Sequence, residues 1–206
     1  MPNGSIPEQL PLRSRTPARW VRQVMAEPLA LLNDHAHLEK KAAANALELL
    51  NRWVGHEPPA DWQGTMAAVA RDEVEHLAIV LRLLTRRGGR LSRSHRNPYA
   101  AALRRLVRVG RGTQESVDRL LVSALIEARS CERFKVLADH CDDRVLARLY
   151  ERLFRSEAGH FQVFLNLSHQ VLAPRQVSTR WNQLLMAEAE ILSAQPPGPA
   201  MHSGVS

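Results

Sequence analysis

Apolar residues recur every three or four positions along most of the chain, the spacing that places them on one face of an α-helix. No segment shows the strict alternation of a half-buried β-strand, so the pattern predicts an all-α fold. Prolines and glycines separate the periodic segments and set their ends. The expected helices cover residues 16–28, 29–54, 63–87, 98–109, 113–140, 144–172 and 175–192.

The four long segments suggest two antiparallel helical hairpins, because the turns GHEPPAD and CDDR between their members are short. The connection at 88–112 is long enough to cross the bundle, which is typical of a ferritin-like four-helix bundle, here with flanking N- and C-terminal helices. A chain of 206 residues is expected to form one domain over residues 16–193. Residues 1–15 are expected to be coil, and residues 194–206 a mobile tail that is poor in apolar side chains.

Glu73 and His76 lie three residues apart on the apolar face of the 63–87 segment, where ionisable side chains are unusual. Neighbours at this spacing can bind one metal ion together. Glu157 and His160 repeat the pattern on the apolar face of the 144–172 segment. One Glu-x-x-His pair is a weak signal, whereas two inward-facing pairs are typical of ferritin-like di-iron sites, in which two other helices each add a glutamate.

The two remaining glutamates are selected by the helix face that they share with apolar residues. Glu39 lies on the apolar face of its helix and Glu48 on the polar face, and Glu127 is preferred to Glu132 for the same reason. In each hairpin, the selected glutamate and the Glu-x-x-His glutamate lie equally far from the expected turn, so both meet at one height. The predicted metal ligands are Glu39, Glu73, His76, Glu127, Glu157 and His160.

The chemistry of this set favours iron or manganese over a structural zinc ion, because it contains carboxylates and imidazoles but no thiolates. Four carboxylates would balance two ferrous ions, and the alternative is a group of buried carboxylates paired with arginine. His35, one turn before Glu39, is expected either to hydrogen-bond that ligand or to be solvated. Cys131 is expected to be a small buried residue, not a ligand.

The formal charge of +7 comes almost wholly from arginine, since only three of the 28 basic residues are lysine. Residues 82–111 contain ten arginines and no acidic residue, which suggests nucleic-acid binding through phosphate contacts. The alternatives are a solvated basic loop and a GC-rich genome that favours arginine codons. The candidate RNA-binding residues are Arg86, Arg87, Arg90, Arg93, Arg96, Arg104, Arg105 and Arg108.

The cellular setting is expected to be the cytoplasm. No apolar run is long enough to span a membrane, and the N-terminal residues lack the apolar centre of a signal peptide. Cys131 and Cys141, ten residues apart in helical sequence, fit reduced thiols better than a disulfide framework.

The segments LLNDHAHLEKKAAANAL, RDEVEHL, IEARSCERF and SEAGHF resemble the ligand-bearing helices of the MiaE family of tRNA hydroxylases over roughly residues 20–190. The resemblance implies a non-haem di-iron monooxygenase that uses O2 and two electrons from an external donor protein. It also implies a substrate, the isopentenyl group of 2-methylthio-N6-isopentenyladenosine beside the tRNA anticodon. The alternatives are a di-iron oxygenase acting on a small molecule, an iron-storage or iron-oxidation protein, and a helical RNA-binding protein without metal.

Overall fold

The computed structural model describes residues 10–205, which form helices and no β-strand. The predicted all-α class is therefore confirmed. The helices are α1 (Arg19–Met25), α2 (Pro28–Leu49), α3 (Trp62–Arg86), α4 (Pro98–Arg104), α5 (Thr113–His140), α6 (Arg144–Glu157), α7 (His160–Val171) and α8 (Pro174–Ser193).

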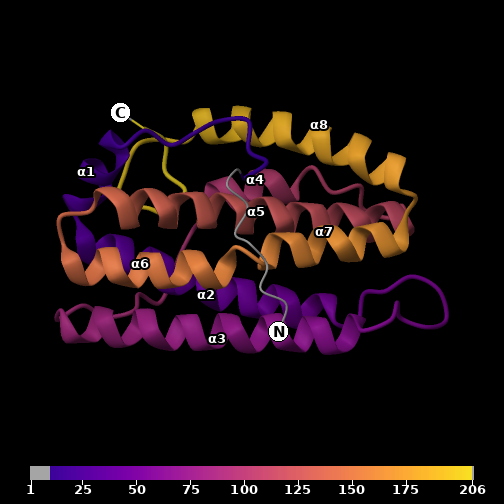
Figure 1. The fold of residues 1–206 in the computed structure, drawn as a ribbon, viewed down its shortest axis with the longest axis horizontal. Coiled ribbons are helices and arrows are strands. Elements are labelled where there is room, and N and C mark those ends of the chain that lie inside the picture. The colour runs from indigo at the N-terminus through magenta and orange to yellow at the C-terminus, as the bar shows by residue number, and fades with distance from the viewer. Residues whose placement is uncertain (1–9, 206) are drawn as a thin grey trace.

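The long helices form the predicted bundle of two hairpins. One hairpin pairs α2 with α3, and the other pairs α5 with α6 and α7, which follow one another end to end (Figure 1). The connection that contains α4 joins the hairpins, and α8 packs on α4 and α5. The ferritin-like topology is thus confirmed, with α1 and α8 as the flanking helices. Among the described residues, no helix is both long and apolar enough to cross a bilayer.

Side chains of the expected kind cap two helix starts. Asn97 accepts a hydrogen bond from the backbone N–H of Ala100 at the start of α4. Asp143 in the CDDR turn accepts from the N–H groups of Val145 and Leu146 at the start of α6. These bonds satisfy N–H groups that have no partner within the helix, which explains why the chain turns at these positions.

The fourth long helix differs from the prediction because it is divided. α6 ends at Glu157 and α7 begins at His160, with a turn at Ala158 and Gly159. Glycine within a helix costs about 1 kcal/mol relative to alanine, so the helix is weakest at this point. The first long helix also ends earlier than predicted, at Leu49, whose carbonyl accepts a hydrogen bond from the Trp62 indole.

The buried apolar residues form two clusters, separated along the bundle by charged residues. On α3, Met66 and Val69 belong to one cluster and Val80 and Leu84 to the other. Glu73 lies between them and is 1% exposed. The two apolar clusters therefore hold the helices together on either side of a polar centre, which they shield from water.

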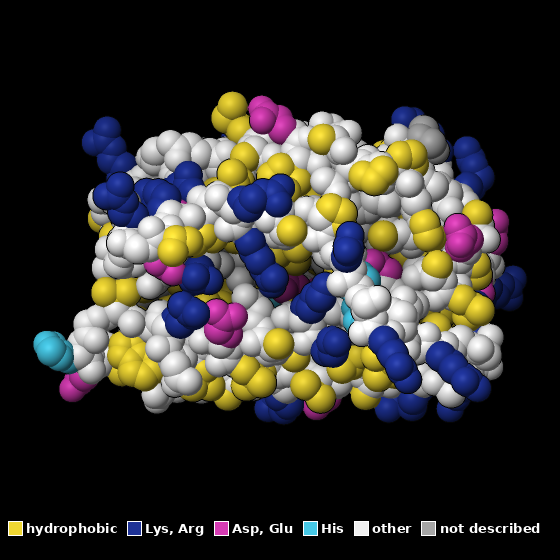
Figure 2. Space-filling view, turned by 180° about the vertical axis from the view of Figure 1, so that it is seen from behind, with side chains coloured by type: hydrophobic (Ala, Val, Ile, Leu, Met, Phe, Trp, Pro, Cys, Tyr) yellow, Lys and Arg dark blue, Asp and Glu magenta, His cyan; other side chains and the backbone are white. Residues whose placement is uncertain are grey.

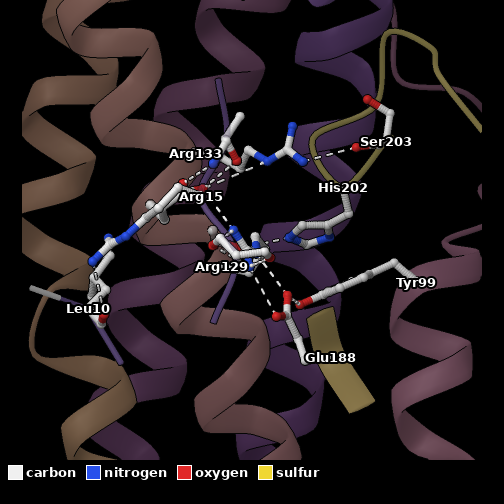
Figure 3. A network of polar contacts seen from close by, with 12 residues as sticks. Leu10, Arg15, Tyr99, Arg129, Arg133, Glu188, His202 and Ser203 are labelled. Carbon is white, nitrogen blue, oxygen red and sulfur yellow. Dashed lines mark hydrogen bonds and ion pairs between the residues drawn. The ribbon is translucent and has the colours of Figure 1, made fainter. Parts of the chain in front are cut away.

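The C-terminal residues correct the prediction of a mobile tail. Met201 is fully buried, and its N–H donates to the Asp34 carboxylate at 2.8 Å. Arg133 on α5 donates to the Ser203 carbonyl at 3.0 Å (Figure 3). The prediction rested on the low apolar content of these residues. Hydrogen bonds to Asp34 and Arg133 hold them in place, and such bonds do not depend on apolar content. At the other end, residues 10–15 lie outside the helices as expected, and residues 1–9 of the predicted coil lie outside the described range.

Candidate metal centre

The six side chains predicted as ligands are all buried in the middle of the bundle, each 8% exposed or less. Four of them offer ligand atoms that all lie within 4.8 Å of one another. These four come from three helices: Glu39 from α2, Glu73 and His76 from α3, and Glu157 from the end of α6. The fold therefore creates a buried carboxylate–histidine cluster that could hold a metal.

Both histidines turn the same ring nitrogen toward the carboxylates. Nδ1 of His76 lies 2.5 Å from Oε1 of Glu157, and Nδ1 of His160 lies 2.6 Å from the other oxygen of that carboxylate. The Nε2 atoms face outward, to the Ser156 hydroxyl at 2.9 Å for His76 and to the Asp72 carboxylate at 3.6 Å for His160. An outer partner of this kind fixes the ring orientation of a metal-binding imidazole.

Sequence reasoning missed these two outer partners. Asp72 and Ser156 each directly precede one of the predicted glutamates, and no spacing rule selects them. By contrast, the possible bond from His35 to Glu39 is present, with 2.5 Å between Nε2 and Oε1. Cys131 is fully buried, as expected for a small core residue.

Glu127 on α5 completes the group from the second hairpin. It lines a small cavity of about 30 Å³ together with Glu39, Glu73 and Glu157. It is not among the four residues with the tightest grouping of ligand atoms. Glutamates from α2, α3, α5 and α6 thus line one small cavity.

The rejected alternatives lie elsewhere. The Glu48 side chain is 53% exposed and pairs with Arg52. Glu132 is buried, but it accepts hydrogen bonds from Thr16 and pairs with Arg129, outside the cluster. Burial and position therefore agree with the preference for Glu39 and Glu127, although ligation by either residue stays a prediction.

With all four carboxylates ionised, the cluster would carry more negative charge than the protein itself neutralises. Burial raises the pKa of Glu39 to about 8, and the charge of Glu157 adds to the effect. Burial likewise raises the pKa of Glu73 and of Glu127 well above 4.5, again with help from neighbouring carboxylates. These shifts mean that ionising the carboxylates without a cation would be costly.

Within the cluster, Glu157 and His160 form a strongly ionised pair. Burial opposes the charge of Glu157, but the His160 and His76 rings outweigh it and hold the pKa of Glu157 at about 2. Burial also opposes the charge of His160, yet Glu157 and Glu73 raise its pKa to about 12. Two protonated histidines would offset only half of four ionised carboxylates, so full ionisation of the cluster requires a further cation.

Unpartnered atoms indicate what would supply this charge. Both oxygens of Glu157 and Nδ1 of His76 are buried without a hydrogen bond of normal geometry, despite their short contacts. Buried polar atoms normally have partners, and donor atoms that converge on one another are the arrangement found around a metal ion. Oxygen and imidazole donors without thiolate fit iron or manganese.

A larger pocket of about 560 Å³ leads to this site between α2, α4 and α5. Leu38, Ala42, Ile126 and Glu127 line both this pocket and the small cavity, so the two spaces adjoin. Seen from behind, the molecule has a central hollow with acidic side chains inside and lysine and arginine side chains around it (Figure 2). The basic residues that line the pocket are Lys41, Arg96, Arg104 and Arg105.

The predicted RNA-binding arginines divide into three groups. Arg96, Arg104 and Arg105 line the pocket, and Arg86, Arg90 and Arg93 are exposed elsewhere. Two others bind acidic residues of the fold: Arg87 pairs with Asp143 at 2.6 Å and Arg108 with Asp118 at 2.7 Å. An arginine held by a carboxylate is less available to a phosphate, so Arg87 and Arg108 are the weakest candidates.

The helical bundle and its buried carboxylate–histidine cluster define a ferritin-like protein with a cluster that could hold a metal. In agreement, a solved structure named "Protein 43 with aldehyde deformylating oxygenase activity from Synechococcus" superimposes with a TM-score of 0.86 and is 36% identical in sequence. The match covers 94% of this chain and 96% of that one.

The family model of the tRNA-(MS2IO6A)-hydroxylase (MiaE) matches residues 6–203, and the chain therefore belongs to this family. A relative from Pseudomonas putida, named tRNA 2-(methylsulfanyl)-N(6)-isopentenyladenosine(37) hydroxylase, is 38% identical over 92% of this chain and 90% of its own. A protein of the same name from Salmonella typhimurium is 29% identical over 94% of this chain and 88% of its own. Membership confirms the resemblance and favours a tRNA hydroxylase over a storage protein.

Proposed function

We propose that this protein hydroxylates the isopentenyl group of 2-methylthio-N6-isopentenyladenosine in the anticodon loop of tRNA. One atom of O2 would enter a C–H bond of the isopentenyl group, and the other would leave as water. The reaction consumes two electrons and two protons, and we assign the electrons to an external donor protein. The family of the chain and the names of its relatives support this substrate.

We assign the metal site to two iron ions held by the six residues predicted from the sequence. The chemistry of O2 activation would come from these ions when they are bound. The protein's own contribution is a charge that suits them, since four carboxylates balance two ferrous ions and leave a neutral centre in the apolar interior. Ser156 and Asp72 would hold the two histidine rings with Nδ1 facing inward.

The pocket beside Glu127 is the observation that carries the proposal. Its walls include apolar side chains such as Leu38, Ala42 and Ile126, which suit a prenyl chain, and basic residues lie around it. Enzymes that act on a base turn it out of the stack, and the arginines would bind the adjoining RNA backbone while this happens. A nucleoside could thus reach the carboxylate cluster from a surface that attracts phosphate.

A small-molecule oxygenase is the nearest alternative, because the similar solved structure carries an aldehyde activity in its name. The basic residues around the pocket favour a polyanion instead. An aldehyde needs no cluster of phosphate-binding side chains at the entrance.

Hydroxylation is tested directly with iron-loaded protein, O2, a reductant and tRNA that contains the prenylated nucleoside. Nucleoside mass spectrometry should show one added oxygen atom in the isopentenyl group. Glu39→Gln, which alters a buried glutamate of α2, should lower the rate by about 100-fold or more. Glu48→Gln is the matched control on the exposed face of the same helix, and it should leave the rate unchanged. Absence of the hydroxylated nucleoside with wild-type protein would refute the proposed function.

RNA binding by the pocket arginines predicts a particular salt dependence. Replacing Arg96, Arg104 and Arg105 by alanine should reduce the slope of log affinity against log salt by about 2, because roughly three phosphate contacts are lost. The control replaces three exposed arginines of α6, which are Arg148, Arg152 and Arg155. An equal change of slope in both variants would show that the attraction is not localised at the pocket.

A further inference from the structure

Asn45 and Ser123 form a polar pair in the wall of the large pocket. This pair takes part in no ion pair and does not belong to the carboxylate cluster. Asn45 on α2 donates from Nδ2 to the Ser123 hydroxyl on α5, with 2.9 Å between the atoms. Both residues line the pocket. In the other asparagine of the pocket, Asn97, both polar atoms of the side-chain amide already have partners. The oxygen caps α4 and the nitrogen contacts His202.

The hydrogen bonds of Ser123 fix the orientation of the Asn45 amide. The serine hydroxyl donates its single proton to the Arg119 carbonyl at 2.9 Å, so it can only accept from Asn45. The NH2 group of Asn45 must therefore face Ser123, and its Oδ1 faces elsewhere. Within the described part of the chain, this Oδ1 has no hydrogen-bond partner, and the second N–H proton of the amide is also unused.

An asparagine that offers one acceptor and one donor side by side is the usual partner of adenine. The amide oxygen accepts from the N6–H of the base, and the amide N–H donates to N7. An adenine with one alkyl group on N6 keeps one N6–H. When the alkyl chain lies on the N1 side of the base, that N–H lies next to N7, so the same two-bond contact is available.

The height of Asn45 in the bundle matches the length of the alkyl chain. Asn45 lies three residues after Ala42 on α2, and Ser123 four residues before Glu127 on α5. Both intervals are close to one helical turn, or about 5 Å along the axis. An isopentenyl group extends about 5 Å from N6 to its terminal methyl groups, given bonds of about 1.5 Å. A base held at Asn45 would therefore place those methyl groups at the level of Glu127.

We propose that Asn45, oriented by Ser123, is a specificity residue that binds the N6–H and N7 edge of an N6-monoalkylated adenine and directs its alkyl chain toward Glu127. This inference rests on the proposed function and names the part of the pocket that selects the base. It excludes purines whose position 6 carries no N–H, such as an oxygen-linked isopentenyl purine.

The test measures binding to metal-free protein, so it does not depend on turnover. Fluorescence anisotropy would compare two anticodon stem-loop RNAs that carry the isopentenyl group on nitrogen or on oxygen at position 6. Wild-type protein should bind the nitrogen-linked RNA about 10-fold more tightly. Asn45→Ala should bind both RNAs equally, at the affinity of the oxygen-linked form. Asn51→Ala, an exposed residue just beyond α2, should keep the wild-type preference.

Two further variants separate recognition from loss of folding. Asn45→Asp keeps an acceptor for N6–H and removes the donor to N7, so it should retain a reduced preference for the nitrogen-linked RNA. Ser123→Ala frees the amide to rotate and should also reduce the preference without removing it. Circular dichroism melts that match wild type would show that each variant is folded.

The outcome for Asn45→Ala decides the inference. If this variant keeps a 10-fold preference, Asn45 does not read the base, and the inference is overturned while the hydroxylase function stands on its own assay. If wild-type protein fails to hydroxylate tRNA, the proposed function is refuted irrespective of the binding result. With iron bound, Asn45→Ala should also spread the added oxygen over more positions of the alkyl chain, because the chain is no longer directed.

Discussion

Helix α5 carries two buried charged clusters on opposite faces, and they differ in charge balance. On one face, Glu127 joins the carboxylates of the predicted metal site. On the other, Arg129 binds the Glu188 carboxylate at 2.8 Å (Figure 3). It also binds the Glu132 carboxylate at 3.1 Å. Both clusters are shielded from water, so burial alone does not distinguish a ligand site from a structural ion pair.

The arginine cluster is neutral by itself. Arg129 and Arg133 face Glu132 and Glu188, and the Tyr99 hydroxyl donates to Glu188 at 2.9 Å. Arg133 also lies over the Trp20 ring at 4.1 Å. The cluster thereby ties α5 to α8, α4 and the N- and C-terminal segments, which is a structural role.

The carboxylate cluster instead has four acids against two histidines. Buried atoms without a hydrogen bond occur in both clusters, at Arg133 and at Glu157, so the excess of one charge is what marks the site that needs an ion. The alternative of buried carboxylates paired with arginine does occur in this protein, but at Glu132 and Glu188 and not at the predicted ligands.

The largest effect is expected from Glu188→Ala. It leaves the fully buried Arg129 and the Tyr99 hydroxyl without their main partner. Breaking a buried pair from one side costs about 3–5 kcal/mol of unfolding free energy, measurable by urea denaturation. Glu151→Ala, which breaks an exposed pair with Arg155, should cost less than about 1 kcal/mol. Equal losses in the two variants would remove the structural role assigned to the arginine cluster.

A second effect concerns pH and the metal-free protein. A carboxyl group whose pKa is raised in the folded state stabilises the fold at pH values below 4.5, its pKa in the unfolded chain. This contribution is lost as the pH rises through the pKa of the folded state. For Glu39 the window runs from about 4.5 to about 8. Below pH 6.5 the buried His35 and His202, whose pKa values burial lowers to about 3, act in the opposite direction, so the decline is expected between pH 6.5 and about 8. The unfolding free energy should fall by up to about 1.4 kcal/mol per pH unit for each proton released. Ferrous iron should abolish the decline, and a flat profile without metal would contradict the charge excess.

The smallest change in stability is expected from Glu73→Gln. This variant removes one acid from the carboxylate cluster, in which acids outnumber histidines. Metal analysis should show loss of bound iron. The unfolding free energy of the metal-free protein should stay constant or rise by about 1 kcal/mol, because a buried carboxyl group is replaced by an amide. Glu75→Gln, two residues away on the exposed face of α3, should change neither quantity. Retention of iron by Glu73→Gln would argue against a ligand role.

The fold was predictable because helix periodicity and turn residues are local signals. The GHEPPAD and CDDR turns lie where they were expected, and Asn97 caps α4 directly before the predicted start of that helix at residue 98. The break after Glu157 was missed, since Gly159 is a single weak signal in an otherwise regular apolar pattern. The packed tail was also missed, because its anchors, Arg133 and Asp34, belong to distant helices.

For the candidate site, the sequence predicted which side chains face the interior of the bundle. Two Glu-x-x-His pairs on apolar faces selected four residues, and the apolar face again separated Glu39 from Glu48. The sequence offered no sign that Ser123 would orient Asn45, because these residues are 78 positions apart and on different helices.

The sequence by itself determined the helices, the bundle and the set of charged residues that point into it, since each of these follows from spacing within one helix. Only the tertiary structure decided that Nδ1 of each histidine faces the carboxylates, that Arg108 binds Asp118, and that a pocket opens beside Glu127. The physical reason is that such features depend on distances between helices. Packing of whole helix faces sets these distances, and spacing along one helix does not encode them.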